Sequence, residues 1–329
     1  MEVGSTLSIQ VVSDGRAGIE NQALGLAEAI QRLTPAEITV KRIRWKPLFD
    51  WLPSPLKVEG MLDSVSDRPF PIEGAAWPDL WIATGRASLP LSLAARRRSG
   101  GRTFVVQTQD PRLPPSRFDM IVAPAHDGLS GDAVFEIVGS PHRITANRIA
   151  EAAPAFAGRL DPLPRPRVAV LVGGRSSAFD LTPDHARRLA EDIADAISAA
   201  GGSLMLTFSR RTPPDARRIM ADRLSSLPGL IWDETGENPL FAFLNAADHI
   251  LVTEDSANMA TEAASTGKPV HILPMVPRRP AEKFARLHAD LEAHGATRPF
   301  NGDLTPWDYV PLNETERAAR AVLEAMATR

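Results

Sequence analysis

The 329-residue sequence contains no cysteine and only one tyrosine. Without cysteine it cannot form disulfides, thiolate zinc sites, iron–sulfur clusters or a cysteine nucleophile. Residues 1–160 carry a net charge of +1 and residues 161–329 a net charge of −4, so counterion-driven binding to nucleic acid is not expected. No apolar run approaches the ~20 residues of a membrane span, and the first residues lack the features of a signal peptide. We therefore expect a cytoplasmic protein with no nucleic-acid partner.

The length and the hydrophobic content of 43% predict two globular domains. Short apolar runs recur, each followed by a loop of glycine, aspartate or serine and then by an apolar pattern of helical period, which is typical of βα units. A proline cluster over residues 154–166 predicts a stiff linker between domains at residues 1–153 and 167–329. The first domain has predicted strands at residues 7–12, 38–43, 80–83, 103–106 and 120–123, and helices at 20–33 and 88–99.

The second domain repeats this pattern and ends in a predicted helix over residues 314–327. Its predicted strands lie at residues 168–172, 203–208, 229–232, 249–253 and 270–273, and its other predicted helices lie at 183–200, 214–226, 256–266 and 281–294. Parallel βα sheets bind ligands at the carboxyl ends of their strands, so the loops there are the places to seek chemistry.

The loop after the first strand contains Asp14, Gly15 and Arg16. A carboxylate at the mouth of the sheet could act as a general base, but aspartate also commonly caps a turn, and position alone does not decide between them. His126 and Asp127 form a second acid–base candidate, which ranks below Asp14 because adjacent residues on a strand point to opposite sides. Neither G-x-G-x-x-G nor a P-loop occurs in the chain.

In the second domain, the Gly173–Phe179 loop combines glycines, serines and an arginine, which favours a phosphate cradle built from free N–H groups and charge. Arg210 and Arg211 follow the next strand and either favour a diphosphate or are solvated surface charges. Ser256 is placed to cap a helix that carries Glu262, which either faces a ligand or is simply exposed.

Several short motifs are spread over nearly the whole chain. They are Asp14-Gly15-Arg16-Ala17-Gly18-x-Glu20-Asn21-Gln22, Gln109-Asp110-Pro111-Arg112, Gly139-x-Pro141-His142-Arg143, Gly173-Gly174, Ser209-Arg210-Arg211-Thr212 and Thr253-Glu254-Asp255-Ser256. Together these motifs resemble those of the mitochondrial-fission (elongated-mitochondria) family. The resemblance implies a GT-B-like fold: two Rossmann-type βα domains with parallel sheets facing a central cleft, and a C-terminal helix.

The wider GT-B pattern implies a role for each group of residues, with Asp14 as the catalytic base. In such transferases the serine and helix amino end meet the donor diphosphate, and the glutamate holds the ribose hydroxyls. The implied donor side consists of Gly173, Gly174, Arg175, Ser176, Ser177, Ser209, Arg210, Arg211, Glu254, Asp255, Ser256, Asn258 and Glu262. The implied acceptor side consists of Gly15, Arg16, Asn21, Gln22, Arg86, Asp110, Arg112, His126 and His142.

The sequence therefore predicts a glycosyltransferase that moves a sugar from a nucleotide-diphosphate sugar to an envelope glycan or lipid-linked acceptor. No metal or other cofactor is expected, because the chain lacks an Asp-x-Asp pair and any zinc-type histidine spacing. The alternative is a non-catalytic interaction protein that kept the fold, connected with organelle or cell-envelope division. A nicotinamide-dependent epimerase is disfavoured, because the single Tyr309 has no Tyr-x-x-x-Lys partner.

Prolines and aromatic residues interrupt the βα pattern over residues 45–78, which we interpret as an ordered excursion of the first domain. Trp45, Phe49 and Trp51 lie there among basic residues. One interpretation docks this segment and Arg96–Arg98 on the anionic surface of an inner membrane. The other packs the aromatics on the domain and leaves the basic residues solvated, and we favour it.

Overall fold

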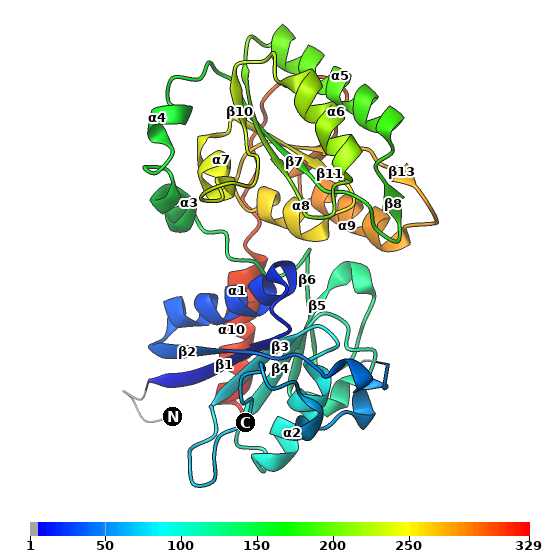
Figure 1. The fold of residues 1–329 in the computed structure, drawn as a ribbon. Helices are drawn as coiled ribbons and strands as arrows, with labels where there is room; N and C mark the ends of the chain where they lie inside the picture. Colours follow the sequence, from blue (N-terminus) through cyan, green and yellow to red (C-terminus); the bar gives the residue numbers. More distant parts are fainter. Residues whose placement is uncertain (1–5, 50) are drawn as a thin grey trace. The chain divides into compact units, whose positions relative to one another are not determined.

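The computed structural model describes residues 6–49 and 51–329 and divides into two compact units (Figure 1). Unit 1 comprises the described residues up to Arg143 together with Asn313–Arg329, and unit 2 comprises Ile144–Leu312. Within the described residues, each unit contains a six-stranded sheet whose neighbouring strands all run parallel. The predicted α/β class with two Rossmann-type domains and a final helix is therefore confirmed.

The sheet of unit 1 has the strand order β2-β1-β3-β4-β5-β6 and is covered on both faces. Helices α1 and α10 pack on one face, while α2 and the aromatic excursion pack on the other. Its strands are β1 (Leu7–Ser13), β2 (Ala36–Arg42), β3 (Leu80–Thr84), β4 (Phe104–Thr108), β5 (Met120–Pro124) and β6 (Val134–Ile137). Its helices are α1 (Ala17–Leu33), α2 (Leu89–Arg98) and α10 (Glu314–Ala327), with short 3-10 turns η1 (Pro47–Phe49), η2 (Ser54–Leu56), η3 (Glu59–Met61), η4 (Pro115–Arg117) and η5 (Ala125–Asp127).

The sheet of unit 2 has the order β10-β9-β7-β11-β12-β14, and its strands β7, β9 and β11 are buried along their whole length. The strands are β7 (Arg167–Val172), β9 (Ser203–Phe208), β10 (Gly229–Ile231), β11 (His249–Thr253), β12 (Val270–Leu273) and β14 (Thr297–Pro299), besides an antiparallel pair β8 (Phe179–Asp180) and β13 (Val276–Pro277). The helices are α3 (Ala146–Ala152), α4 (Ala157–Leu160), α5 (Pro183–Ala199), α6 (Pro214–Leu224), α7 (Leu240–Ala246), α8 (Ala257–Ala264) and α9 (Glu282–Ala293).

Helix α5 illustrates how the sequence builds these layers. Thr182 caps its first turn by accepting a hydrogen bond from the amide of His185 at 3.3 Å, and Pro183 occupies the first helical position, where its missing N–H costs nothing. Buried residues such as Leu189, Ile193 and Ile197 recur at helical spacing and join the core under β7 and β9.

The final helix α10 belongs to unit 1, whereas the sequence interpretation assigned residues 167–329 to one domain. Small buried residues, Ala318 and Ala319, let α10 approach α1 closely. The amide of His142 donates to the Thr315 hydroxyl at 3.1 Å, and the amide of Val138 donates to the Glu314 carboxylate at 2.8 Å. These contacts are tertiary, so the periodicity of the helix could not locate its partner.

The proline cluster is likewise a packed part of unit 2 rather than a linker between units. Phe156 and Leu160 are buried, and α4 contacts β10. The backbone carbonyl of Asp161 accepts from the Arg167 guanidinium at 2.7 Å, and the carbonyl of Pro164 accepts from the Ser203 hydroxyl at 2.6 Å. The division of the chain accordingly falls after Arg143 instead of over residues 154–166.

Candidate functional site

The ligand-binding position of unit 2 follows from its strand order. Strands β7 and β11 are neighbours, but the chain continues from β7 toward β9 and from β11 toward β12, on opposite sides. Such a reversal leaves a crevice at the carboxyl ends of the two strands, where doubly wound α/β sheets bind their ligands. The loops that meet there begin at Gly173 and at Glu254, as the sequence predicted.

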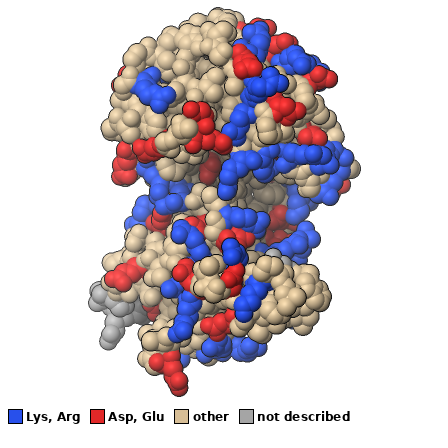
Figure 2. Space-filling model, viewed as in Figure 1, with Lys and Arg blue, Asp and Glu red and all other residues tan. Residues whose placement is uncertain are grey.

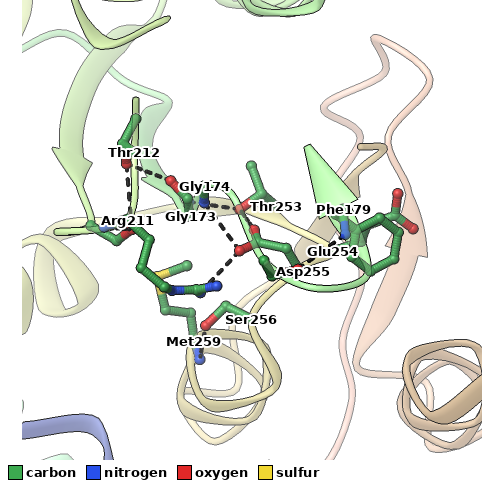
Figure 3. Close-up of polar contacts among 12 residues, drawn as sticks. Gly173, Gly174, Phe179, Arg211, Thr212, Thr253, Glu254, Asp255, Ser256 and Met259 are labelled. Atoms are coloured by element: carbon green, nitrogen blue, oxygen red, sulfur yellow. Dashed lines mark hydrogen bonds and ion pairs between the residues drawn. The ribbon is translucent and has the colours of Figure 1, made fainter. Parts of the chain in front are cut away.

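Asp255 is the polar centre of this crevice (Figure 3). Its side chain has no exposed surface and accepts from the amide of Gly174 at 3.0 Å, from the Thr253 hydroxyl at 2.7 Å and from the Arg211 guanidinium at 2.9 Å. The same Thr253 hydroxyl accepts from the amide of Gly173 at 2.8 Å. One buried carboxylate thus connects the loops that follow β7, β9 and β11.

Both positions require glycine, because neighbouring atoms lie too close to leave room for a Cβ. A Cβ on Gly173 would lie 2.0 Å from the Asp255 carboxylate, and a Cβ on Gly174 would lie 2.1 Å from the backbone oxygen of Arg211. Their N–H groups are occupied by these internal hydrogen bonds, so the expectation that they donate freely to a phosphate is wrong. They shape the crevice instead.

Arg210 and Arg211 have different surroundings, although they are adjacent. Arg211 pairs with Asp255, its backbone oxygen accepts from the amide of Arg175 at 3.1 Å, and its amide donates to the Ser209 hydroxyl at 3.1 Å. Arg210 is exposed, and no ion pair or hydrogen bond engages its guanidinium within the described residues. Of these two arginines, Arg210 is therefore the one whose guanidinium has no partner among the described residues and is available to an incoming anion.

The remaining residues of the β7 loop divide in the same way. The Ser176 hydroxyl accepts from the amides of Ala178 and Phe179 at 3.2 and 3.0 Å, so it holds the turn rather than a ligand. Ser177 and Arg175 are exposed at its tip, and the Arg175 guanidinium pairs with the Asp180 carboxylate at 3.8 Å. Arg278, which the sequence interpretation missed, donates to the backbone oxygen of Ser176 at 3.0 Å. No spacing in the sequence indicates that Arg278 lies beside the β7 loop.

Helix α8 starts at the crevice and carries Glu262 six residues after its capping residue Ser256. The Ser256 hydroxyl accepts from the amide of Met259 at 3.4 Å, which confirms the predicted cap; Asn258 lies in the same first turn. Glu262 is partly buried, and burial raises the pKa of its carboxyl to about 7. No hydrogen bond or ion pair engages this carboxyl among the residues described. Glu262 is therefore poised between its neutral and ionised forms near neutral pH.

Glu254 serves the structure rather than the ligand side. Its carboxylate accepts from the amide of Met275, and burial raises its pKa. A ring nitrogen of His288, another residue that the sequence did not point to, lies 2.9 Å from the Glu254 backbone oxygen. These contacts join the β11 loop to β12 and α9.

In unit 1 the corresponding reversal of strand order lies between β1 and β3, and Asp14 directly follows β1. Its carboxylate accepts from the Arg16 amide at 3.1 Å and from the Arg16 guanidinium at 2.6 Å, and this pairing raises the pKa of Arg16. Both sequence hypotheses for Asp14 remain compatible with this geometry, because it closes the turn with one oxygen and remains partly exposed.

A second carboxylate of the Asp14 motif, that of Glu20, is buried and was not among the residues predicted for the site. Glu20 accepts from the Ser13 hydroxyl at 2.7 Å and from the Arg42 guanidinium at 2.9 and 2.8 Å. The Arg42 hydrogen bonds outweigh burial and lower the pKa of Glu20. The only signal for a role of Glu20 was its place in the Asp14 motif.

Most of the predicted acceptor residues follow the neighbouring strands β1, β3, β4 and β5. The side-chain oxygen of Gln22 accepts from the side-chain NH₂ of Gln109 at 2.8 Å, and the backbone amide of Arg112 donates to the Asp110 carboxylate at 2.7 Å. Gln109 and Arg112 adopt positive φ angles of 70° and 53°, which are uncommon for residues other than glycine. Also near these strand ends are Gly15, Asn21, the exposed Arg86 and the buried His126.

His142 does not join this group. It follows β6, is 5% exposed, and its backbone lies against Gly25 of α1, where an added Cβ would be 2.3 Å from the His142 oxygen. Burial and the nearby Arg32 lower the pKa of His142 to about 4, so the ring is neutral at pH 7. Its environment is that of a packed core residue, which argues against contact with an acceptor.

The chain is similar to proteins of one known family. A model of the family described as mitochondrial fission ELM1 matches residues 17–326. The chain belongs to this family. The mitochondrial fission protein ELM1 of Arabidopsis thaliana is 30% identical over 279 residues, which cover 77% of this chain and 65%, less than two thirds, of the plant protein. An uncharacterized protein of Rickettsia prowazekii is 25% identical over 362 residues, with 97% and 99% of the two chains covered.

Solved structures share the fold of this ELM1-family chain. UDP-GlcNAc 2-epimerase from Neisseria meningitidis, bound to UDP-GlcNAc, has a TM-score of 0.56 at 14% identity and covers 99% of this chain and 100% of its own. The Methanocaldococcus jannaschii enzyme of that name has a TM-score of 0.55 at 14% identity, with 97% and 100% covered. Likeness at this identity establishes the GT-B-like fold alone. Among the described residues, no helix is long and apolar enough to cross a bilayer, and no group of three metal-ligating side chains occurs.

Proposed function

We propose that this ELM1-family protein binds a nucleotide-diphosphate sugar at the β7–β11 crevice of unit 2 and transfers the sugar to an envelope glycan or lipid acceptor without a metal ion. The observation that carries the proposal is the buried Asp255 network. It holds three loops in one geometry while leaving Arg210 and Glu262 without partners among the described residues. Structures of the same fold that are named for bound UDP-GlcNAc support this class of donor.

The charges suit the two ends of such a donor. The exposed Arg210 and Arg175, together with the amino end of α8, would stabilise the negative charge that develops on the leaving diphosphate. Glu262 would accept hydrogen bonds from the ribose hydroxyls, and these bonds would favour its ionised form. On unit 1, Asp14 would take the proton of the acceptor hydroxyl as general base.

Binding is tested by thermal shift with UDP-, GDP-, CMP- and ADP-sugars. We expect one nucleotide class to stabilise the protein, and we expect Glu262→Ala to abolish that stabilisation. Glu237→Ala, which removes an exposed glutamate of the same unit, is the matched control and should respond as the native chain does. No response to any nucleotide sugar would rule out the donor site.

Catalysis is tested separately. A nucleotide sugar is mixed with an envelope glycan or lipid fraction as acceptor, and the release of nucleotide diphosphate is measured. Asp14→Asn should bind donor normally and lose turnover, and full activity of this variant would refute its role as base. Because structures of this fold include UDP-GlcNAc 2-epimerases, UDP-GlcNAc is also incubated alone. If UDP-GlcNAc is converted to its 2-epimer without acceptor, the proposed activity becomes epimerisation instead of sugar transfer.

The second candidate is a non-catalytic interaction protein, which the name of the Arabidopsis thaliana relative favours. It predicts that the Asp255 network contributes to stability alone. Donor binding that disappears in Glu262→Ala would therefore count against it.

A further inference from the structure

The exposed apolar side chains of this protein are concentrated in one segment. Of the seven large hydrophobic residues that are highly exposed in the described parts of the chain, six lie between Leu48 and Ile72. Four of them fall within eleven residues, which we call the apolar segment: Leu48, Trp51, Leu56 and Val58, exposed by 72, 77, 60 and 59%. Single exposed apolar residues are ordinary, but such a concentration marks an interaction surface.

Hydrogen bonds to the rest of unit 1 hold the backbone around the apolar segment in place. The Trp45 indole, which is buried, donates to the backbone oxygen of Ala87 at 3.0 Å, and the Ser54 hydroxyl donates to that of Arg86 at 3.3 Å. The amide of Lys46 donates to the backbone oxygen of Met61 at 3.1 Å, and η2 contacts α2. The prediction that this excursion is ordered agrees with these contacts, and Trp45 packs as favoured, whereas Trp51 does not.

A basic pocket adjoins the apolar segment. It has a volume of about 570 Å³, and Val58 lines it together with Lys57, Arg97, Arg98 and Arg117. Its one acidic residue, Glu59, is paired with Arg98 at 3.0 Å. Arg97 and Arg117 are exposed, and within the described residues neither has an ion pair. Figure 2 shows basic side chains gathered at the lower edge of unit 1, where Figure 1 places α2.

We propose that the apolar segment and the basic pocket dock unit 1 on a bilayer that contains anionic phospholipids. Lipid phosphates would enter the pocket and meet Arg97 and Arg117, while Trp51 and Leu48 would enter the boundary between headgroups and acyl chains. A two-fold contact with a second copy would bring the same positive charges against one another, which disfavours self-association. A soluble polyanion would leave the apolar side chains in water. The proposal does not depend on the donor site.

The test is flotation of the full chain with vesicles of phosphatidylcholine alone or with one quarter phosphatidylglycerol. We expect binding to the anionic vesicles only, and weaker binding in 0.5 M salt because salt screens the attraction. In Arg97→Gln/Arg117→Gln the partition coefficient should fall about 30-fold, which corresponds to about 1 kcal/mol for each basic residue near the surface. Leu48→Ser/Trp51→Ser should lose at least about tenfold by removing buried apolar area.

Two matched variants of unit 2 control for charge and apolar area. Arg188→Gln/Arg223→Gln removes two exposed arginines, and Val310→Ser removes another highly exposed apolar residue; both should bind vesicles as the native chain does. Circular dichroism checks that each variant is folded. Equal binding to neutral and anionic vesicles, no binding, or equal losses in the control variants would overturn the proposal. So would a dimer in light scattering that Leu48→Ser/Trp51→Ser converts to a monomer.

Discussion

Replacing Asp255 by alanine should be among the most destabilising single changes in unit 2. The substitution removes the acceptor of three hydrogen bonds, from Gly174, Thr253 and Arg211, at a side chain with no exposed surface. Removing one partner of a buried charge pair costs about 3–5 kcal/mol, because the other donors stay desolvated. Arg211 is 44% exposed and can recover water, which favours the lower end of that range.

The measurement is urea unfolding followed by circular dichroism, with hydrogen exchange of peptides covering residues 168–178 as a local probe. Asp255→Asn keeps the volume of the side chain but faces donors with its NH₂ group, so we expect a loss of about 1–3 kcal/mol for the unsatisfied groups. Asp222→Ala is the control: its side chain is 71% exposed and its change should stay within about 0.5 kcal/mol. A loss below about 1 kcal/mol in Asp255→Ala, with unchanged exchange, would refute the role given to this residue.

Three further predictions concern α1 and α8. Gly25→Ala should destabilise the fold by about 1–3 kcal/mol, because its Cβ would meet the His142 backbone at 2.3 Å, whereas Gly158→Ala has open space and should be neutral in the same urea titration. With the pKa of Glu262 near 7, donor affinity measured by calorimetry should rise about tenfold from pH 6 to pH 8 as the carboxyl ionises, and Glu262→Gln should show a flat profile. The folded state lowers the pKa of Glu20, so its stabilising effect is present above its unfolded pKa and is lost as pH falls; Glu20→Gln should therefore flatten the acid limb of a stability profile, and an unchanged limb would contradict this.

Local patterns predicted the elements of this fold well because apolar runs and helical periods are properties of neighbouring residues. Strand β9 and helix α10 lie where the sequence placed them, at Ser203–Phe208 and Glu314–Ala327. Short or edge elements such as β14 (Thr297–Pro299) were missed, since three residues carry too little pattern. The docking of α10 on α1 was also missed, because packing between small residues far apart in sequence leaves no local signal.

The candidate site was predictable as a set of loops but not as a set of roles. Parallel strands end at the same edge of their sheet, so Gly173 and Asp255 were expected to meet. Nothing in the pair Arg210-Arg211 indicates that one guanidinium is bound to a buried carboxylate while its neighbour remains free. That difference depends on which way each side chain leaves the turn after β9, and only the folded backbone determines it.

This division of roles bears on how activity data from this site should be interpreted. Asp255, Thr253 and Ser176 hold loops, so their loss would reduce donor binding through misplacement of the crevice. Arg210 and Glu262 have no such bonds within the described residues, so their loss would act on the ligand with the fold intact. If Glu262→Ala no longer binds donor but has the same midpoint of urea unfolding as the native chain, the loss shows that Glu262 contacts the donor. The same binding defect in an Asp255 variant does not show contact, because the crevice itself is displaced.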